Sequence, residues 1–173
     1  MENLNVLISK EEIEKKLEKL ASQLDKDYEG KEITILSVLN GAVFFTTELT
    51  LKMKTKMRFA FIKISSYEGT ESTGKVTLKS DVSNSLIEGK DVLIVEDIVD
   101  TGRSMSYLLE HIKAKNPKSL KLCSLVSKPS RREIEVPIDY LGFEIPNKFI
   151  IGYGFDDEEG FRRNLPYIGY KEV

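Results

Sequence analysis

Three carboxylates, Glu96, Asp97 and Asp100, stand within five residues near the middle of the chain, and Thr101 and Gly102 follow them directly. Carboxylates accept hydrogen bonds from sugar hydroxyls and can hold a hydrated Mg²⁺. If a helix begins just beyond them, its first amides and nearby hydroxyls can bind a phosphate. A ligand with a phosphate next to a diol, such as a ribose 5-phosphate, would satisfy both sets of groups.

The elements that flank these residues predict where they lie. Residues 92–95 form a continuous β-branched apolar run, typical of a strand buried on both faces. After the acidic turn, apolar residues recur at helical spacing: Met105, Leu108, Leu109 and Ile112. In an open parallel sheet such a turn lies at the carboxyl end of a strand, where ligands bind. A helix cap after an ordinary strand is the simpler interpretation, but it explains only Asp100 or Thr101.

Residues 96–102, preceded by four apolar residues, resemble the phosphoribosyl-pyrophosphate signature of the type I phosphoribosyltransferases, and further details resemble their hypoxanthine-guanine branch. The resemblance runs from about Ile33 to the C-terminus and is most specific at residues 92–104. It implies an α/β fold with a mainly parallel central sheet flanked by helices. It also implies a small hood built from the N- and C-terminal segments. We expect residues 1–173 to form a single domain.

Composition narrows the function classes. The 173 residues are 40% apolar and 31% charged, as in an ordinary soluble globular protein. The 26 basic and 28 acidic residues nearly cancel, which argues against bulk electrostatic binding to nucleic acid or membrane. No signal peptide or membrane-length apolar run is evident, so we expect a cytoplasmic protein. Cys123 and His111 are the only cysteine and histidine, which disfavours Cys–His catalysis and a zinc site.

The rest of the chain alternates predicted strands with helices, which favours the α/β class. A capping box at Ser9 and Glu12 opens an N-terminal helix, and residues 33–39 form an apolar strand. Leu39, Asn40 and Gly41 end that strand. The resemblance implies that their backbone amides face the pyrophosphate, often with an unusual peptide geometry. Many relatives have a basic residue in the middle position, where this chain has Asn40.

Residues 65–74 are rich in Ser, Thr and Gly and follow a predicted strand at 57–64. Such a segment buries little and is predicted to be mobile. An exposed hairpin loop is the simpler interpretation. The resemblance implies instead an active-site cover in which Ser66 and Tyr67 close over the pyrophosphate and exclude water.

The purine would be held by residues that follow later strands. Lys128 comes at the carboxyl end of a predicted strand over 120–126, and the resemblance implies that it binds the exocyclic oxygen of the base. An ammonium only donates, so it favours a 6-oxopurine over a 6-aminopurine. The resemblance also implies that Phe149 stacks on the purine and that Ile150 contacts it through the backbone. Arg131 and Arg132 are expected to be surface charges.

For the sugar and its leaving group, the resemblance implies three sets of contacts. Glu96 and Asp97 hold the ribose and Mg²⁺, and Asp156 is a second metal-binding acid. Arg162 neutralises the pyrophosphate. The 5′-phosphate is held by amides of the turn, contributed by Thr101, Gly102, Arg103 and Ser104.

The predicted reaction is transfer of the 5-phosphoribosyl group from phosphoribosyl pyrophosphate to N9 of hypoxanthine or guanine. Asp100 would act as general base or as a hydrogen-bond partner at N7. Three alternatives stay open: another acceptor such as adenine, xanthine or a pyrimidine, a non-catalytic nucleotide sensor, and an unrelated α/β nucleotide-binding protein. Because relatives are dimers or tetramers, a homodimer or homotetramer is expected.

Overall fold

The computed structural model describes residues 4–66 and 75–172, and within them two sheets and three α-helices form the fold. The helices are α1 (Lys10–Asp27), α2 (Val43–Leu51) and α3 (Arg103–Lys113), with short 3-10 turns η1 (Asn84–Leu86) and η2 (Pro129–Arg131). The strands are β1 (Asn5–Ile8), β2 (Glu32–Leu39), β3 (Lys56–Ser66), β4 (Val76–Ser80), β5 (Asp91–Val99), β6 (Ser119–Ser127), β7 (Tyr140–Glu144), β8 (Ile150–Ile151) and β9 (Ile168–Tyr170).

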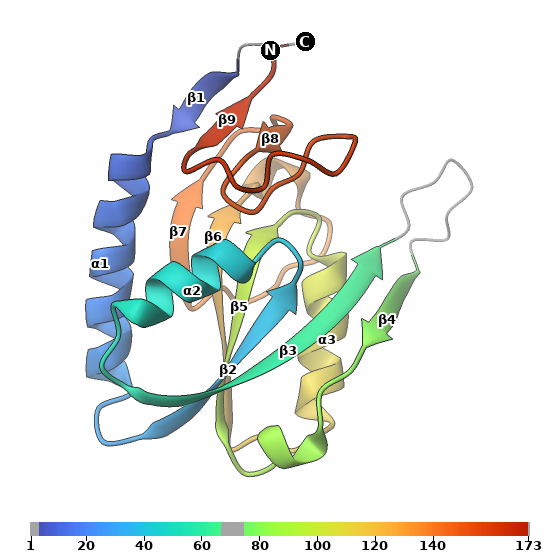
Figure 1. The fold of residues 1–173 in the computed structure, drawn as a ribbon. Coiled ribbons are helices and arrows are strands. Elements are labelled where there is room, and N and C mark those ends of the chain that lie inside the picture. Colours follow the sequence, from blue (N-terminus) through green and yellow to red (C-terminus); the bar gives the residue numbers. More distant parts are fainter. Residues whose placement is uncertain (1–3, 67–74, 173) are drawn as a thin grey trace.

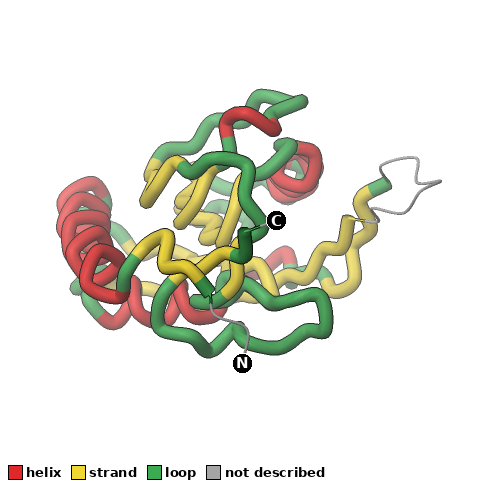
Figure 2. Tube along the Cα trace, turned by 90° about the horizontal axis from the view of Figure 1, so that it is seen from above, coloured by secondary structure: helices red, strands yellow, loops and turns green. Residues whose placement is uncertain are grey.

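The main sheet has the strand order β4-β3-β2-β5-β6-β7 and is parallel except for β4, which pairs antiparallel with β3 at one edge. Helices α1 and α2 cover one face and α3 covers the other (Figures 1 and 2). Alternate residues of β5 therefore enter different cores: Leu93 and Val95 pack with α1 and α2, while Val92 and Ile94 pack with α3. Burial on both faces explains the unbroken apolar run, and the predicted α/β class is confirmed.

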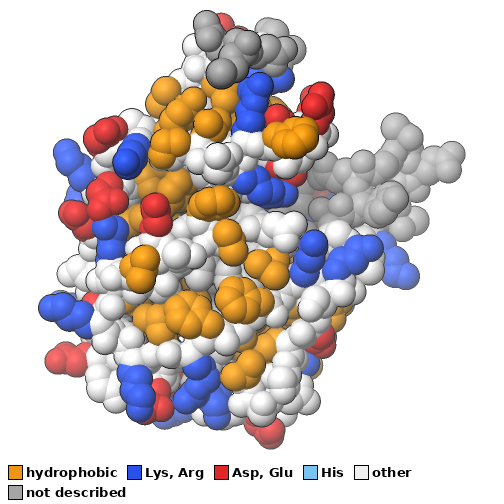
Figure 3. Space-filling view, viewed as in Figure 1, with side chains coloured by type: hydrophobic (Ala, Val, Ile, Leu, Met, Phe, Trp, Pro, Cys, Tyr) orange, Lys and Arg blue, Asp and Glu red, His pale blue; other side chains and the backbone are white. Residues whose placement is uncertain are grey.

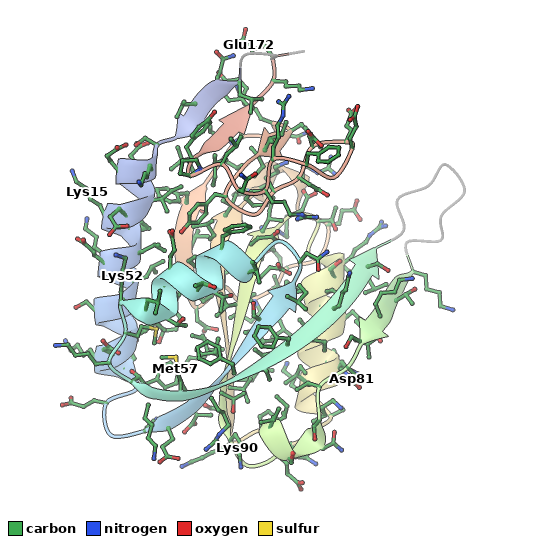
Figure 4. All side chains as sticks on the ribbon, viewed as in Figure 1. Lys15, Lys52, Met57, Asp81, Lys90 and Glu172 are labelled. Atoms are coloured by element: carbon green, nitrogen blue, oxygen red, sulfur yellow. The ribbon has the colours of Figure 1, made fainter. Side chains whose placement is uncertain are left out.

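Helix α1 begins at the predicted capping box. The Ser9 amide donates to the Glu12 carboxylate at 2.7 Å, and the Glu12 amide donates to the Ser9 hydroxyl at 3.1 Å. Lys52, at the end of α2, donates to Glu14 and ties the two helices together (Figure 4). Among the described residues, no helix combines the length and the apolar character needed to cross a membrane.

Asp25 of α1 fixes the chain between α2 and β3. Its carboxylate accepts from the amides of Lys54 and Thr55, both at 2.9 Å, and from the Thr55 hydroxyl at 2.7 Å. Burial alone would raise the pKa of Asp25, but these hydrogen bonds outweigh it and lower the pKa below its ordinary value. The contact therefore stabilises the fold most when Asp25 is ionised.

The second sheet forms the predicted hood. Its order β1-β9-β8 joins a strand from the start of the chain to two from the end, with Asn5 opposite Tyr170 and Ile150 also opposite Tyr170. The hood lies beyond the carboxyl ends of the parallel strands, where β1 and β9 run side by side (Figure 1). The hood therefore stands over the edge of the sheet where the acidic turn lies.

One face of the molecule carries exposed apolar side chains (Figure 3). Phe59 and Phe61 of β3 are 44% and 49% exposed, although Ala60 and Ile62 between and after them are buried under α3. Leu51, at the end of α2, is also exposed. Strand β3 thus has one buried face and one face that α1 and α2 leave largely uncovered.

Candidate active site

Strand β5 is longer than the apolar run predicted. It continues to Val99, because its parallel pairing with β6 extends to Val99 opposite Ser127. The expectation that Glu96 and Asp97 belong to a turn is therefore wrong: both lie in the last part of the strand, and only residues 100–102 form the connection to α3. Being in a strand fixes their backbone more firmly than a turn would.

A cleft of about 410 Å³ opens at the carboxyl ends of the strands. It lies where the connections after β2 and β5 meet, and the segment around η2 and a single arginine from the C-terminal segment also reach it. It brings together ten of the predicted site residues: Leu39, Asn40, Gly41, Glu96, Asp97, Asp100, Thr101, Gly102, Arg103 and Ser104.

The start of α3 is open toward this cleft. Gly102 is the N-cap residue with φ of +87° and has no side chain to cap the helix, and the side-chain contact at this end is a long one, from the Arg103 amide to the Thr101 hydroxyl at 3.3 Å. Asp100 therefore does not act as the helix cap considered above, and Thr101 engages only the first amide. The amide of Ser106 is bonded within the helix, to the carbonyl of Gly102 at 2.9 Å. The amides before it lie at the positive end of the helix dipole, where an anion is favoured.

The connection after β2 is packed against the acidic strand. The Leu39–Asn40 peptide bond is cis, in agreement with the unusual geometry that the resemblance implies. A Cβ atom at Gly41 would lie 1.8 Å from Oδ2 of Asp97 and 3.4 Å from the carbonyl oxygen of Gly154. Only glycine allows the backbone to approach the carboxylate so closely.

Glu96 and Asp97 form an acidic pair in which Glu96 is buried and Asp97 is partly buried. Glu96 is only 7% exposed, and the Asp97 amide donates to its carboxylate at 2.7 Å. Burial, and then the charge of Asp97, raise the pKa of Glu96 well above its ordinary value. Burial also raises the pKa of Asp97, although its hydrogen bonds and the charge of Arg163 act in the opposite direction. The pair therefore gains most from a ligand that brings positive charge.

The donor set of this pair fits Mg²⁺. Carboxylate oxygens are hard ligands, and Mg²⁺ is commonly held by one or two carboxylates together with water and substrate phosphates. In residues 4–66 and 75–172, no group of three or more His, Cys, Asp or Glu side chains is arranged to hold a metal ion. An ion held by Glu96 and Asp97 would thus depend on a phosphorylated substrate for its remaining ligands.

Two arginines expected to be surface charges instead hold the turn after β5. Arg131 Nε donates to Asp100 Oδ1 at 2.7 Å. Arg132 donates to the carbonyl oxygens of Asp100 and Val99 at 3.1 and 3.3 Å, and to the Ser127 hydroxyl at 2.6 Å. The expectation for both residues is wrong, because η2 folds back over the turn and brings them within reach of its polar groups.

Of the two adjacent C-terminal arginines, Arg163 lines the cleft and Arg162 does not. Arg163 donates to the Gly154 carbonyl at 2.6 Å and to Asp156 at 2.7 Å. Arg162 has a φ of +70° and lies 3.4 Å from Asp157 instead. The pyrophosphate role that the resemblance implies for Arg162 stays a prediction, and Asp156 is paired with Arg163 and does not line the cleft.

The residues predicted to bind the purine are not among the residues that line the cleft. Lys128 is buried and follows β6, and its amide donates to the Val99 carbonyl at 3.0 Å, so it lies next to the end of β5. Phe149 is 50% exposed and precedes Ile150, which is buried in the hood strand β8. Ser66 ends β3, whereas Tyr67 lies outside the described residues.

Comparison with known proteins agrees with this geometry. Residues 7–158 match the family described as phosphoribosyl transferase domain. The chain is 45% identical over 165 residues to the bifunctional protein TilS/HprT of Listeria monocytogenes, covering 95% of this chain but only 25% of that protein. It is 44% identical to the hypoxanthine-guanine-xanthine phosphoribosyltransferase of Tritrichomonas foetus, covering 95% of this chain and 89% of that one.

Among solved structures, a hypoxanthine-guanine phosphoribosyltransferase from Bacillus anthracis superposes with a TM-score of 0.90. It is 42% identical in sequence, and the match covers 98% of this chain and 100% of the other. The likeness therefore extends over the hood as well as the main sheet.

Proposed function

The chain belongs to the phosphoribosyltransferase family, in its hypoxanthine-guanine branch, and from this premise we propose its reaction. The protein transfers the 5-phosphoribosyl group from phosphoribosyl pyrophosphate to N9 of hypoxanthine or guanine. The products are IMP or GMP and pyrophosphate, so the protein acts in purine salvage.

One observation carries the proposal. The acidic pair Glu96 and Asp97 and the open first turn of α3 line the same cleft. A phosphate bound to the amides of residues 101–104 places the attached ribose toward the pair. The two carboxylates then accept hydrogen bonds from the ribose hydroxyls. A dinucleotide or nucleoside triphosphate site would instead require a glycine-rich turn that the chain does not have.

The chemistry follows from the charges in the cleft. Transfer passes through an oxocarbenium-like transition state, in which the sugar gains positive charge and the pyrophosphate gains negative charge. Arg163 lies beside the acidic pair and stabilises the departing pyrophosphate, the role that the resemblance implies for Arg162. Mg²⁺ held by Glu96 and Asp97 would supply further positive charge there, and Asp156 is a candidate second ligand once Arg163 turns to the pyrophosphate.

Asp100 handles the proton of the base. It follows the carboxyl end of β5 and lines the cleft, and the carbonyl of the preceding Val99 accepts from the amide of Lys128, one of the residues assigned to the purine. Its carboxylate either takes the proton from the ring N–H at N7 as general base or accepts a hydrogen bond from it.

Selectivity for the base rests on Lys128, Phe149 and Ile150. The ammonium of the buried Lys128 donates a hydrogen bond to a 6-oxo group. A 6-amino group is itself a donor, so it would leave the ammonium without an acceptor. The half-exposed ring of Phe149 offers one face for stacking, and the backbone of Ile150 reads the edge of the base. These assignments give a 6-oxopurine as acceptor and do not discriminate at the 2-position of the base.

We further infer a cytoplasmic homodimer or homotetramer. The exposed face formed by Phe59 and Phe61 of β3 and Leu51 of α2 is apolar enough to be covered by a second copy. Light scattering after size-exclusion chromatography would give the mass, and a 19.7 kDa species would contradict this inference.

The function is tested by supplying Mg²⁺, phosphoribosyl pyrophosphate and one free base at a time, and detecting nucleotide by chromatography. We expect IMP and GMP to form and adenine to be a poor acceptor. Absence of nucleotide with every purine would refute the proposal, and efficient AMP formation would refute the assignment of Lys128.

A further inference from the structure

We propose that Arg131 is a positioning residue for Asp100. Its guanidinium holds one carboxylate oxygen of Asp100 so that the other is presented to the imidazole ring of the purine. The proposal rests on the proposed function, because only there does Asp100 meet a purine.

The contact itself is short and lies at the cleft. Arg131 Nε donates to Asp100 Oδ1 at 2.7 Å, and both residues line the cleft. Their side chains are 37% and 34% exposed, so the pair is neither deeply buried nor on the open surface. A charge-assisted hydrogen bond of this length is among the stronger interactions a carboxylate can make.

The backbones that carry the two side chains are fixed to one another. Asp100 follows β5 and Arg131 ends η2, which follows the neighbouring strand β6. The Lys128 amide donates to the Val99 carbonyl at 3.0 Å, and the amides of Glu133 and Ile134 donate to the Thr101 carbonyl at 2.9 and 3.0 Å. These bonds lie on both sides of the ion pair along the chain. The pair is therefore set by the two connected loops and not by long side chains that meet at random.

The bond has a consequence for the chemistry. The carboxylate of an aspartate can rotate about its Cβ–Cγ bond and present either oxygen to a ligand. This freedom must be lost before the carboxylate can accept a hydrogen bond from the purine N–H in one defined geometry. Arg131 engages Oδ1, and within the part of the chain described here no other donor to the Asp100 carboxylate is found. Oδ2 is thus the oxygen left for the base, already oriented before the base arrives.

A direct role in phosphate binding is the main competing explanation, because Arg131 keeps its two terminal nitrogens for other acceptors. The two roles differ in what they couple to. A positioning residue acts through Asp100, so its loss should matter only while Asp100 is present. A phosphate-binding residue acts on the sugar donor and should matter with or without Asp100.

The test is a double-mutant cycle with the variants Arg131→Gln, Asp100→Asn and the combination, assayed for kcat and for the KM of phosphoribosyl pyrophosphate. We expect Arg131→Gln to lower kcat about tenfold and to change KM less than about twofold. The expected loss of kcat is no larger because the ion pair is partly exposed and solvent weakens it. In the Asp100→Asn background, the same substitution should have no further effect on kcat. Arg131→Lys keeps the charge and should lose less than Arg131→Gln.

Arg58→Gln is the matched control, because Arg58 is paired at 3.4 Å with Glu32 at the opposite end of the sheet from the cleft and should leave both constants unchanged. A rise in KM with kcat unchanged, or equal losses with and without Asp100, would overturn the proposal. If Arg131→Gln unfolds below the assay temperature, the cycle is completed with Arg131→Lys under the same criteria. An inactive wild-type chain would refute the proposed function itself, whereas an active one with uncoupled variants refutes only the role of Arg131.

Discussion

Replacing Gly41 with alanine should remove most of the activity while the chain stays folded. The added Cβ would lie 1.8 Å from Oδ2 of Asp97 and 2.8 Å from its Cγ. An ordinary van der Waals contact needs roughly 3.5 Å, so the carboxylate must retreat by more than about 1.5 Å. The displaced group is the end of a side chain, so the overpacking should cost only about 1–3 kcal/mol of stability.

The same displacement should be costly for catalysis. Asp97 belongs to the acidic pair proposed to hold the ribose and Mg²⁺, and misplacement of a reacting geometry by about 1 Å can cost on the order of a hundredfold in rate. We therefore expect kcat/KM for phosphoribosyl pyrophosphate to fall about a hundredfold, measured by nucleotide formation. A thermal melt should show a cooperative transition close to that of the wild type.

Gly154→Ala is the comparison that separates the two effects. Gly154 has a φ of +102°, and a Cβ there would lie 2.0 Å from the carbonyl oxygen of Gly41, a backbone atom that cannot turn away. This variant should lose stability first and activity with it. A folded Gly41→Ala protein with wild-type kcat/KM would refute the reasoning, because it would mean that the position of Asp97 does not matter.

Four further outcomes follow from the contacts described above. Asp100→Asn should lower kcat about 10²- to 10⁴-fold while changing the KM for phosphoribosyl pyrophosphate little, and equal changes in both would remove its role at the base. Lys128→Ala should weaken the preference for hypoxanthine over adenine at least about tenfold, and unchanged selectivity in competition assays would count against the assignment. Arg163→Gln should raise the KM for phosphoribosyl pyrophosphate several-fold more than Arg162→Gln in steady-state kinetics, and the reverse order would restore Arg162 to that role. Asp25→Asn should lower the free energy of unfolding in urea by about 1–2 kcal/mol at pH 7. Because folding lowers the pKa of Asp25 from 3.8, the stability difference between wild type and variant should shrink as the pH falls below 3.8, and an equal difference at pH 3 and pH 7 would contradict this sign.

The elements of the fold could be predicted because each is specified locally. The capping box at Ser9 starts α1, and the apolar run at 92–95 needs no knowledge of its neighbours to indicate a strand buried on both faces. Strand β5 was predicted too short because Glu96 and Asp97 are poor strand formers by type. Pairing with β6, and a cleft that accepts their side chains, override that preference.

Contacts between distant segments could not be predicted in this way. Arg131 and Asp100 are 31 residues apart, and nothing local indicates that η2 folds back over the turn. That Arg163 lines the cleft, and not Arg162, could not be predicted for a different reason. Asp157 accepts the amides of Glu159 and Phe161 at 3.0 and 2.8 Å, and the tight turn that results changes which of the two adjacent arginines faces the cleft.

A crystal structure of the protein with IMP and Mg²⁺ would test the central claim most directly. We expect the 5′-phosphate to accept hydrogen bonds from the amides of residues 101–104, with the ribose hydroxyls donating to Glu96 and Asp97. A phosphate bound at another place on the protein, with those two carboxylates turned away from the sugar, would contradict the account.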